Sequence, residues 1–290
     1  IMRMPDRNSG ASLNCKDLYA DYVKSNSFEK TMIRCLQSLI PYLKRDDEID
    51  IQKIMNWEEV KEIIVPELVC TRRAGENLED LIYRNVEGTD LAIIYRVKQQ
   101  VANIVGSIKV SKQMMETWGV DENRIHEFAF HNMNQLSTLQ IVELNSDFAM
   151  PEETFSELPE KMNKYSSYVF TNKEAFYGAA TIMEEGMLHS IAERLQEGFY
   201  LLPMDVDNIV VYPEGMMKNL ESIHSMVLIH NIQCLEPENY LSDQVYYYSK
   251  EKGELSMSTN PENTQDVIIK ILQQAMECSP GKKEDYGEER

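Results

Sequence analysis

The sequence lacks the short motifs that most often reveal an activity. It has no Gly-x-x-x-x-Gly-Lys and no Gly-x-Gly-x-x-Gly, the loops that hold nucleotide phosphates on backbone N–H groups. It also has no Gly-x-Ser-x-Gly turn for a serine nucleophile. The five cysteines are odd in number, lie far apart and form no Cys-x-x-Cys, which argues against a disulfide framework or a zinc ribbon. We therefore expect no cofactor.

A metal site is not expected either, although two histidines come close to a zinc motif. His126, Glu127 and His131 resemble His-Glu-x-x-His, but the imidazoles are five residues apart. That spacing separates them by about 140° around a helix. Zinc needs two histidines four residues apart on one face, so we expect surface histidines here.

Long hydrophobic runs and basic residues are also scarce. No stretch approaches the roughly 20 apolar residues of a membrane span, and residues 1–10 contain no apolar run typical of a signal peptide. The chain has 29 basic and 48 acidic residues and therefore a net charge of −19. This charge disfavours binding to nucleic acid or anionic lipid. These features predict a cytoplasmic protein.

The acidic excess is concentrated in one part of the chain. Residues 151–262 hold 19 acidic residues and seven basic ones, a net charge of −12. Three interpretations stay open for this stretch: it confers solubility, it binds a basic partner, or it mimics nucleic acid.

Hydrophobic periodicity predicts helices over residues 11–64. Ser27 is the expected N-cap of the main helix, and Pro41 should kink or end it. A further short helix opens at Asn56 and is expected to stop at Pro66, before a short strand at residues 68–70.

After this region the pattern predicts two strands and then a helix, four times over. The turn at residues 250–253 supports this interpretation because Gly253 accepts a positive φ. The expected pattern defines an α+β fold, with a helical N-terminal region followed by antiparallel β-β-α units whose helices pack on the sheet. Whether the units are true repeats stays open. The expected strand pairs and helices are 91–97, 102–110 and 111–136; 168–171, 178–183 and 185–196; 199–202, 209–212 and 216–229; 245–248, 254–257 and 264–276.

The same sequence patterns divide the chain into five predicted regions. A Pro- and Glu-rich segment is expected to be a linker, and the charged end of the chain a disordered tail. The regions are a helical part with a short strand at 1–90, a first β-β-α unit at 91–150, the linker at 151–165, an acidic α+β region at 166–278 and the tail at 279–290.

Two aromatic features suggest either core packing or a contact surface. Trp118 stands beside Gly119 at a helix end. In the run Tyr246-Tyr247-Tyr248, the first and third side chains share one face of a strand and Tyr247 takes the other.

Four ordered motifs resemble a known family. They are Trp118-Gly119 with Asn132, Thr171-Asn172 with Gly178-Ala179, Leu201-Leu202-Pro203 with Pro213, and Leu241-Ser242-Asp243 with Val245-Tyr246. Together they are similar to the domain-of-unknown-function family 5688 of gut clostridial bacteria, over roughly residues 18–258. The resemblance implies a bacterial cytoplasmic protein and no established activity, so no catalytic residue can be transferred. The candidate binding positions are Trp118, Asn132, Thr171, Asn172, Asp243 and Tyr246.

The sequence leaves three functional hypotheses. The first is a non-catalytic binding or accessory protein whose acidic surface meets another protein, with a basic partner as the best match in charge. The second is a hydrolase whose site is assembled from distant strand ends, with Asn172, Asp243 and Tyr246 as its polar groups. The third is a DNA mimic. The partner, the biological process and the oligomeric state stay open.

Overall fold

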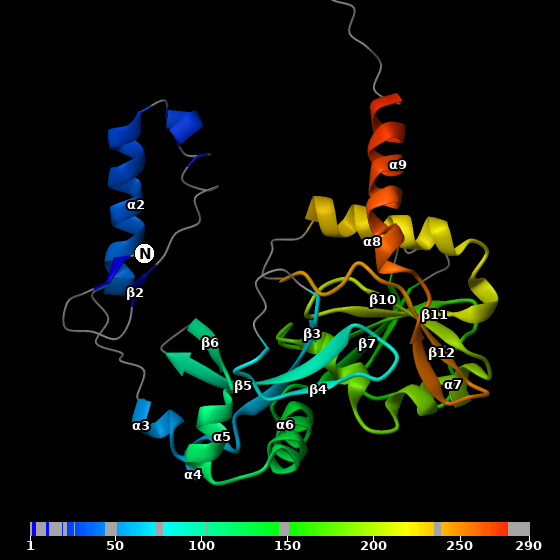
Figure 1. Cartoon of the computed structure of the whole chain (residues 1–290), viewed down its shortest axis with the longest axis horizontal. Coiled ribbons are helices and arrows are strands. Elements are labelled where there is room, and N and C mark those ends of the chain that lie inside the picture. Colours follow the sequence, from blue (N-terminus) through cyan, green and yellow to red (C-terminus); the bar gives the residue numbers. More distant parts are fainter. Residues whose placement is uncertain are drawn as a thin grey trace, which may run out of the picture. The chain divides into compact units, whose positions relative to one another are not determined.

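The protein is described by a computed structural model (Figure 1). It describes residues 2–3, 10–11, 19, 22–25, 27–43, 51–72, 78–101, 104–144, 151–234 and 239–277. The chain divides into two compact units, one made of 1–60 and 98–108 and the other of 61–97 and 109–290. The expected tail at 279–290 lies outside the described residues.

The first unit is mainly helical, as the sequence predicts for the N-terminal region. The N–H of Lys30 donates to Ser27 Oγ at 3.4 Å, so Ser27 caps the main helix. Pro41 lies in the last turn of that helix, two residues before its end at Leu43. The elements are β1 (Met2–Arg3), β2 (Gly10–Ala11), α2 (Phe28–Leu43), α3 (Ile51–Ile54) and α4 (Trp57–Val60).

The second unit contains a seven-stranded antiparallel sheet in the order β13-β12-β10-β11-β9-β7-β8. The predicted hairpins β10–β11 and β12–β13 are confirmed, and each is followed by a helix. The strands are β7 (Leu139–Leu144), β8 (Pro151–Phe155), β9 (Ser167–Asn172), β10 (Phe199–Pro203), β11 (Ile209–Pro213), β12 (Tyr246–Ser249) and β13 (Glu254–Met257). The later helices are η1 (Gly178–Met183), α7 (Met187–Leu195), η2 (Glu214–Met216), α8 (Leu220–Cys234), η4 (Pro261–Asn263) and α9 (Thr264–Glu277).

Helix α8 covers one face of this sheet (Figure 1). Val227 of α8 is fully buried against Leu202, Val210 and Val245. Four methionines pack around this cluster, which fits the ability of flexible thioethers to fill irregular space. They are Met204, Met216, Met217 and Met226.

A smaller sheet and two helices belong mainly to the second unit, although residues 98–101 and 104–108 of this sheet are assigned to the first. The sheet has the order β3-β5-β4, with β6 paired to β5. Helix α6 packs on β3 through Asn132, whose side-chain amide donates to the carbonyls of Lys61 at 2.7 Å and Ile64 at 2.9 Å. The elements are β3 (Ile64–Cys70), β4 (Tyr83–Asn85), β5 (Leu91–Val101), β6 (Ile104–Lys109), α5 (Lys112–Trp118) and α6 (Glu122–Leu136).

Two expectations about this smaller sheet are wrong. Pro66 does not stop a helix but lies inside β3, opposite Tyr95 of β5. Since β3 is at the edge of its sheet, the missing N–H of proline can face away from the neighbouring strand. The turn expected at residues 98–100 is also wrong, because β5 continues to Val101 before β6 begins at Ile104.

Two expectations about the larger sheet are also wrong. Gly178–Met183 is a 3₁₀ helix instead of a strand, and the Thr181 hydroxyl donates to the Gly178 carbonyl at 2.7 Å within it. The expected linker at 151–165 begins with strand β8, which pairs with β7 at the edge of the sheet. An edge position tolerates Pro151 as the first residue of the strand. Strand β7 itself was not expected.

The protein is thus an α+β protein with antiparallel sheets, as its sequence predicts. The grouping into β-β-α units stays a prediction. Within the ranges that the structure describes, no helix is long and apolar enough to cross a membrane.

The bonds of Asn132 lead to a prediction about stability. Asn132→Leu keeps the size of the side chain but leaves the buried Ile64 carbonyl and the part-buried Lys61 carbonyl without these donors, so we expect a loss of about 1–3 kcal/mol in unfolding free energy. Urea denaturation followed by circular dichroism measures this loss. Gln135→Leu on the exposed side of the same helix is the control, with an expected change within about 0.5 kcal/mol. Equal losses in the two variants would contradict the role of Asn132.

Candidate functional site

The segment Leu241-Ser242-Asp243, which carries one of the family-like motifs, is held against helix α8. The Asn231 side-chain amide donates to the Ser242 carbonyl at 3.0 Å and to Asp243 Oδ1 at 2.8 Å. His224 Nε2 donates to the Asp243 carbonyl at 2.9 Å. Asp243 therefore fixes this loop to the helix.

Tyr246 lies at the centre of a buried polar network. Its hydroxyl donates to Asp90 Oδ1 at 2.6 Å and lies 2.7 Å from Ser242 Oγ. Burial, followed by the charge of Asp90, raises the pKa of Tyr246 well above its usual value. Burial also raises the pKa of the neighbouring Cys70 thiol to about 12, with Asp90 adding to the effect. At neutral pH this cysteine is a thiol and a poor nucleophile.

The Thr171-Asn172 step ends strand β9 and folds the turn that follows it. The Asn172 side chain donates to the Phe176 carbonyl at 2.9 Å and accepts from the Phe176 N–H at 3.0 Å. A Cβ on Gly178 would lie 2.7 Å from the Asn172 nitrogen and 2.9 Å from Thr171 Oγ1, so this position requires glycine. The motif is explained by close packing at this turn.

The remaining two predicted positions lie in the smaller sheet's helices. Trp118 is buried at the end of α5, before Gly119 at φ 67°. Asn132 joins α6 to β3, as described above. The structure thus brings Asp243 and Tyr246 into one neighbourhood around Ser242 and places Trp118, Asn132 and the Thr171-Asn172 step elsewhere. A binding role for any of the six stays a prediction.

A different group of side chains forms a partly exposed surface on strands β10 and β12, beside the buried Tyr212 of β11. Tyr200 pairs with Tyr212 on one side and with Tyr247 on the other, so the three tyrosines form a row across the sheet. The rings of Tyr200 and Tyr247 lie 5.0 Å apart, and both side chains are partly exposed. Carboxylates surround this end of the row. We call Tyr200, Tyr247, Glu197, Glu214 and Glu251 the acidic tyrosine patch.

Two glycines allow these groups to approach one another. A Cβ on Gly198 would lie 2.4 Å from the Tyr247 hydroxyl and 2.9 Å from Glu214 Oε2, so any side chain there would push the patch apart. The N–H of Gly215 donates to Glu197 Oε1 at 2.9 Å, which fixes a second carboxylate beside η2.

The patch presents negative charge and aromatic faces together. The Tyr247 hydroxyl donates to Glu214 Oε2 at 2.8 Å. Burial and this hydrogen bond raise the pKa of Tyr247 to about 12, so the phenol stays neutral at physiological pH. Glu197, Glu214 and Glu251 form no ion pair with any residue that the structure describes. Their charges are therefore available to a cation from outside.

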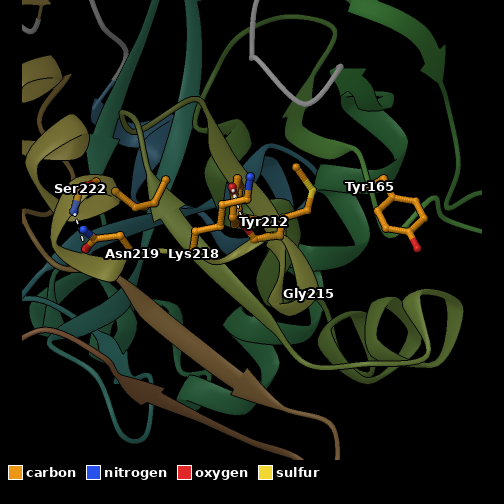
Figure 2. A pocket seen from close by; sticks show the side chains of 8 residues that line it. Tyr165, Tyr212, Gly215, Lys218, Asn219 and Ser222 are labelled. Carbon is orange, nitrogen blue, oxygen red and sulfur yellow. Dashed lines mark hydrogen bonds between the residues drawn. The ribbon is translucent and has the colours of Figure 1, made fainter.

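A cavity of about 590 Å³ adjoins the patch through Tyr212 and Gly215 (Figure 2). Figure 2 shows Tyr165 and Ser222 at opposite ends of the cavity, with Tyr212 between them. Met216 and Ile223 add apolar surface, while Lys218 and Asn219 add polar groups near the start of α8. The cavity can accept a side chain with an apolar body.

The acidic tyrosine patch was only partly visible in the sequence. The alternation in the Tyr246-Tyr247-Tyr248 run correctly predicts that Tyr247 faces away from its two neighbours, which are buried. The contact of Glu214 with Tyr247 and of Glu197 with Gly215 depends on strand register and on η2, which the sequence pattern does not reveal. Among the described residues, no group of three or more His, Cys, Asp or Glu side chains is placed to hold a metal ion.

The fold and this surface define an antiparallel α+β protein with an acidic, aromatic patch beside a cavity. Residues 1–250 match a family of unknown function (DUF5688), and the chain belongs to that family. The resemblance in the sequence motifs is thereby confirmed. Comparison with curated proteins finds no match, and neither does comparison with solved structures.

The buried network around Tyr246 leads to a second stability prediction. Tyr246→Phe leaves Asp90 without its strongest donor in a buried site, so we expect a loss of about 1–3 kcal/mol in unfolding free energy. Tyr248→Phe on the same face of β12 is the matched control, because the Tyr248 hydroxyl makes no hydrogen bond with the described residues. Chemical denaturation measures both. If Tyr248→Phe is as destabilising as Tyr246→Phe, the bond to Asp90 is not the cause.

Proposed function

We propose that this protein is a non-catalytic binding or accessory protein of the bacterial cytoplasm, and that it holds a basic partner protein on the acidic tyrosine patch. The observation that carries the proposal is a pair of partly exposed, neighbouring tyrosine rings with Glu214 and Glu251 beside Tyr247 and Glu197 beside the adjacent Gly215. The bacterial origin is proposed from the resemblance described above alone.

The chemistry of the patch matches lysine and arginine side chains. A cation over a tyrosine face gains about 0.5–1 kcal/mol at an exposed site. Carboxylates beside the rings add charge-assisted hydrogen bonds, which are stronger than those between neutral groups. Glu214 is already oriented by the Tyr247 hydroxyl, so it does not need to be ordered when the partner binds.

The charge of the surrounding residues and the adjoining cavity also fit a basic partner protein. Residues 151–262 carry a net charge of −12, which accelerates the encounter with a basic protein. The adjoining cavity combines Tyr165 and Tyr212 with Met216 and Ile223, and aromatic and methionine side chains are typical of the centres of protein interfaces.

A hydrolase has less support. Of its three predicted polar groups, Asn172 folds a turn, Asp243 fixes a loop to α8 and Tyr246 satisfies a buried carboxylate. Each therefore already has a structural function in the fold.

The proposal is tested by affinity purification of the tagged full chain from its host, at low and high salt. Glu197→Gln, Glu214→Gln and Glu251→Gln are combined in one patch variant. We expect a basic protein to bind the unmodified chain at low salt, to dissociate at high salt, and to bind the patch variant at least tenfold more weakly, which is about 1.4 kcal/mol.

A matched control has the same change in net charge. Glu153, Glu157 and Glu160 are exposed carboxylates outside the patch, and their combined change to glutamine should leave binding nearly unaltered. Equal weakening by both triple variants would show a general charge effect and would contradict a specific patch. A partner that survives high salt unchanged would contradict the electrostatic basis of the proposal.

A further inference from the structure

A second cavity, of about 660 Å³, lies between the start of α8 and the start of α9. It is lined mainly by polar side chains, and it contains none of the residues of the acidic tyrosine patch. Leu220 and Val267 provide its apolar surface, and His224, Ser258, Asn263 and Asp266 provide polar groups.

His224 gives this cavity a defined hydrogen-bond acceptor. The side chain is 4% exposed and lines the cavity from α8. Its Nε2 is bonded to the Asp243 carbonyl at 2.9 Å, and a carbonyl oxygen can only accept, so Nε2 carries the proton. In the neutral ring, Nδ1 is therefore an acceptor, and it has no hydrogen-bond partner among the described residues.

The environment keeps this ring neutral. Burial lowers the pKa of His224 below its usual value, although the hydrogen bond to the Asp243 carbonyl and the charges of Asp243 and Glu221 oppose the effect. The Nδ1 atom is not among the fully buried polar atoms that lack a partner, so a donor can reach it, and a ligand that donates an N–H to it would form a hydrogen bond there.

The charges at the cavity favour a cationic donor. Asp266 is exposed and forms no ion pair with any described residue. Glu221 is bridged to Lys270 at 3.1 Å, and both side chains of that pair are 62% exposed, so the cavity keeps one uncompensated carboxylate.

We infer that this cavity binds a small ligand with a primary ammonium group, which donates to His224 Nδ1 and pairs with Asp266. The ammonium group has three donors and no acceptor, which fits an imidazole lone pair, a carboxylate and the Ser258 or Asn263 oxygens. The alkyl chain of the ligand contacts Leu220 and Val267. A free amine and the side chain of a lysine both supply this chemistry.

Binding of cadaverine to the full chain, measured by calorimetry, tests the inference. We expect saturable binding, with 1,5-pentanediol of the same chain length binding at least tenfold more weakly because it lacks the charge. Nα-acetyl-lysine methylamide distinguishes the sources: binding equal to that of cadaverine indicates a lysine side chain, and binding of cadaverine alone indicates a free amine. Equal binding of the diol, or no binding of either amine, would overturn the inference.

Two variants test the residues. Asp266→Gln should weaken cadaverine binding about three- to tenfold, whereas Glu262→Gln, which alters an exposed carboxylate outside the cavity lining, should not change it. His224→Gln keeps an amide donor for the Asp243 carbonyl but removes the Nδ1 acceptor, and we expect at least a tenfold loss of affinity.

A spectroscopic measurement keeps the inference testable if His224→Gln does not fold. In a ¹⁵N-detected spectrum of the unmodified protein, the His224 Nδ1 resonance should have the shift of an unprotonated nitrogen and should move when cadaverine is added. A resonance that stays fixed at saturating cadaverine would show that His224 does not contact the ligand.

Discussion

The hydrogen bond between Asp90 and Tyr246 joins the two sheets of the larger unit. Asp90 precedes β5 in the smaller sheet, and Tyr246 begins β12 in the larger one. The backbone repeats this connection, because the Met257 N–H donates to the Gly88 carbonyl at 2.9 Å. A Cβ on Gly88 would lie 2.2 Å from the Leu255 carbonyl oxygen, so only glycine allows this approach. A buried carboxylate without such a donor would be strongly unfavourable, and the position of β12 is fixed accordingly.

The residues of the family-like motifs make contacts that hold the fold together wherever the motifs were described above. Ser242 accepts from the Gln244 N–H and lies beside the Tyr246 hydroxyl, while Asn231 and His224 hold Asp243. These residues shape the path of the chain from α8 into β12. Motifs of this kind identify a fold, and the surface and the cavity for which we propose a partner and a ligand lie beside them.

Local patterns predicted the elements whose signal is contained in their own residues. The β12–β13 hairpin follows from the turn at Gly253, and α9 follows from its apolar periodicity. Strand β8 and the proline inside β3 were missed, because their stability depends on edge positions in sheets that only the full fold creates. The same limit applies to the sites. Tyr247 could be assigned to a face, but Glu214 reaches it only through the register of β10, β11 and β12.

The two edge strands of the larger sheet determine whether a strand of another molecule can pair with it. At one end, β13 is short and carries Glu254 and Ser256 as exposed residues; at the other, β8 begins with Pro151 and exposes Glu153. Charged and proline residues at a sheet edge oppose the addition of a strand from another chain. Strand exchange and fibril-like stacking are disfavoured at both edges, so the recognition proposed above would use side chains on the faces of this sheet.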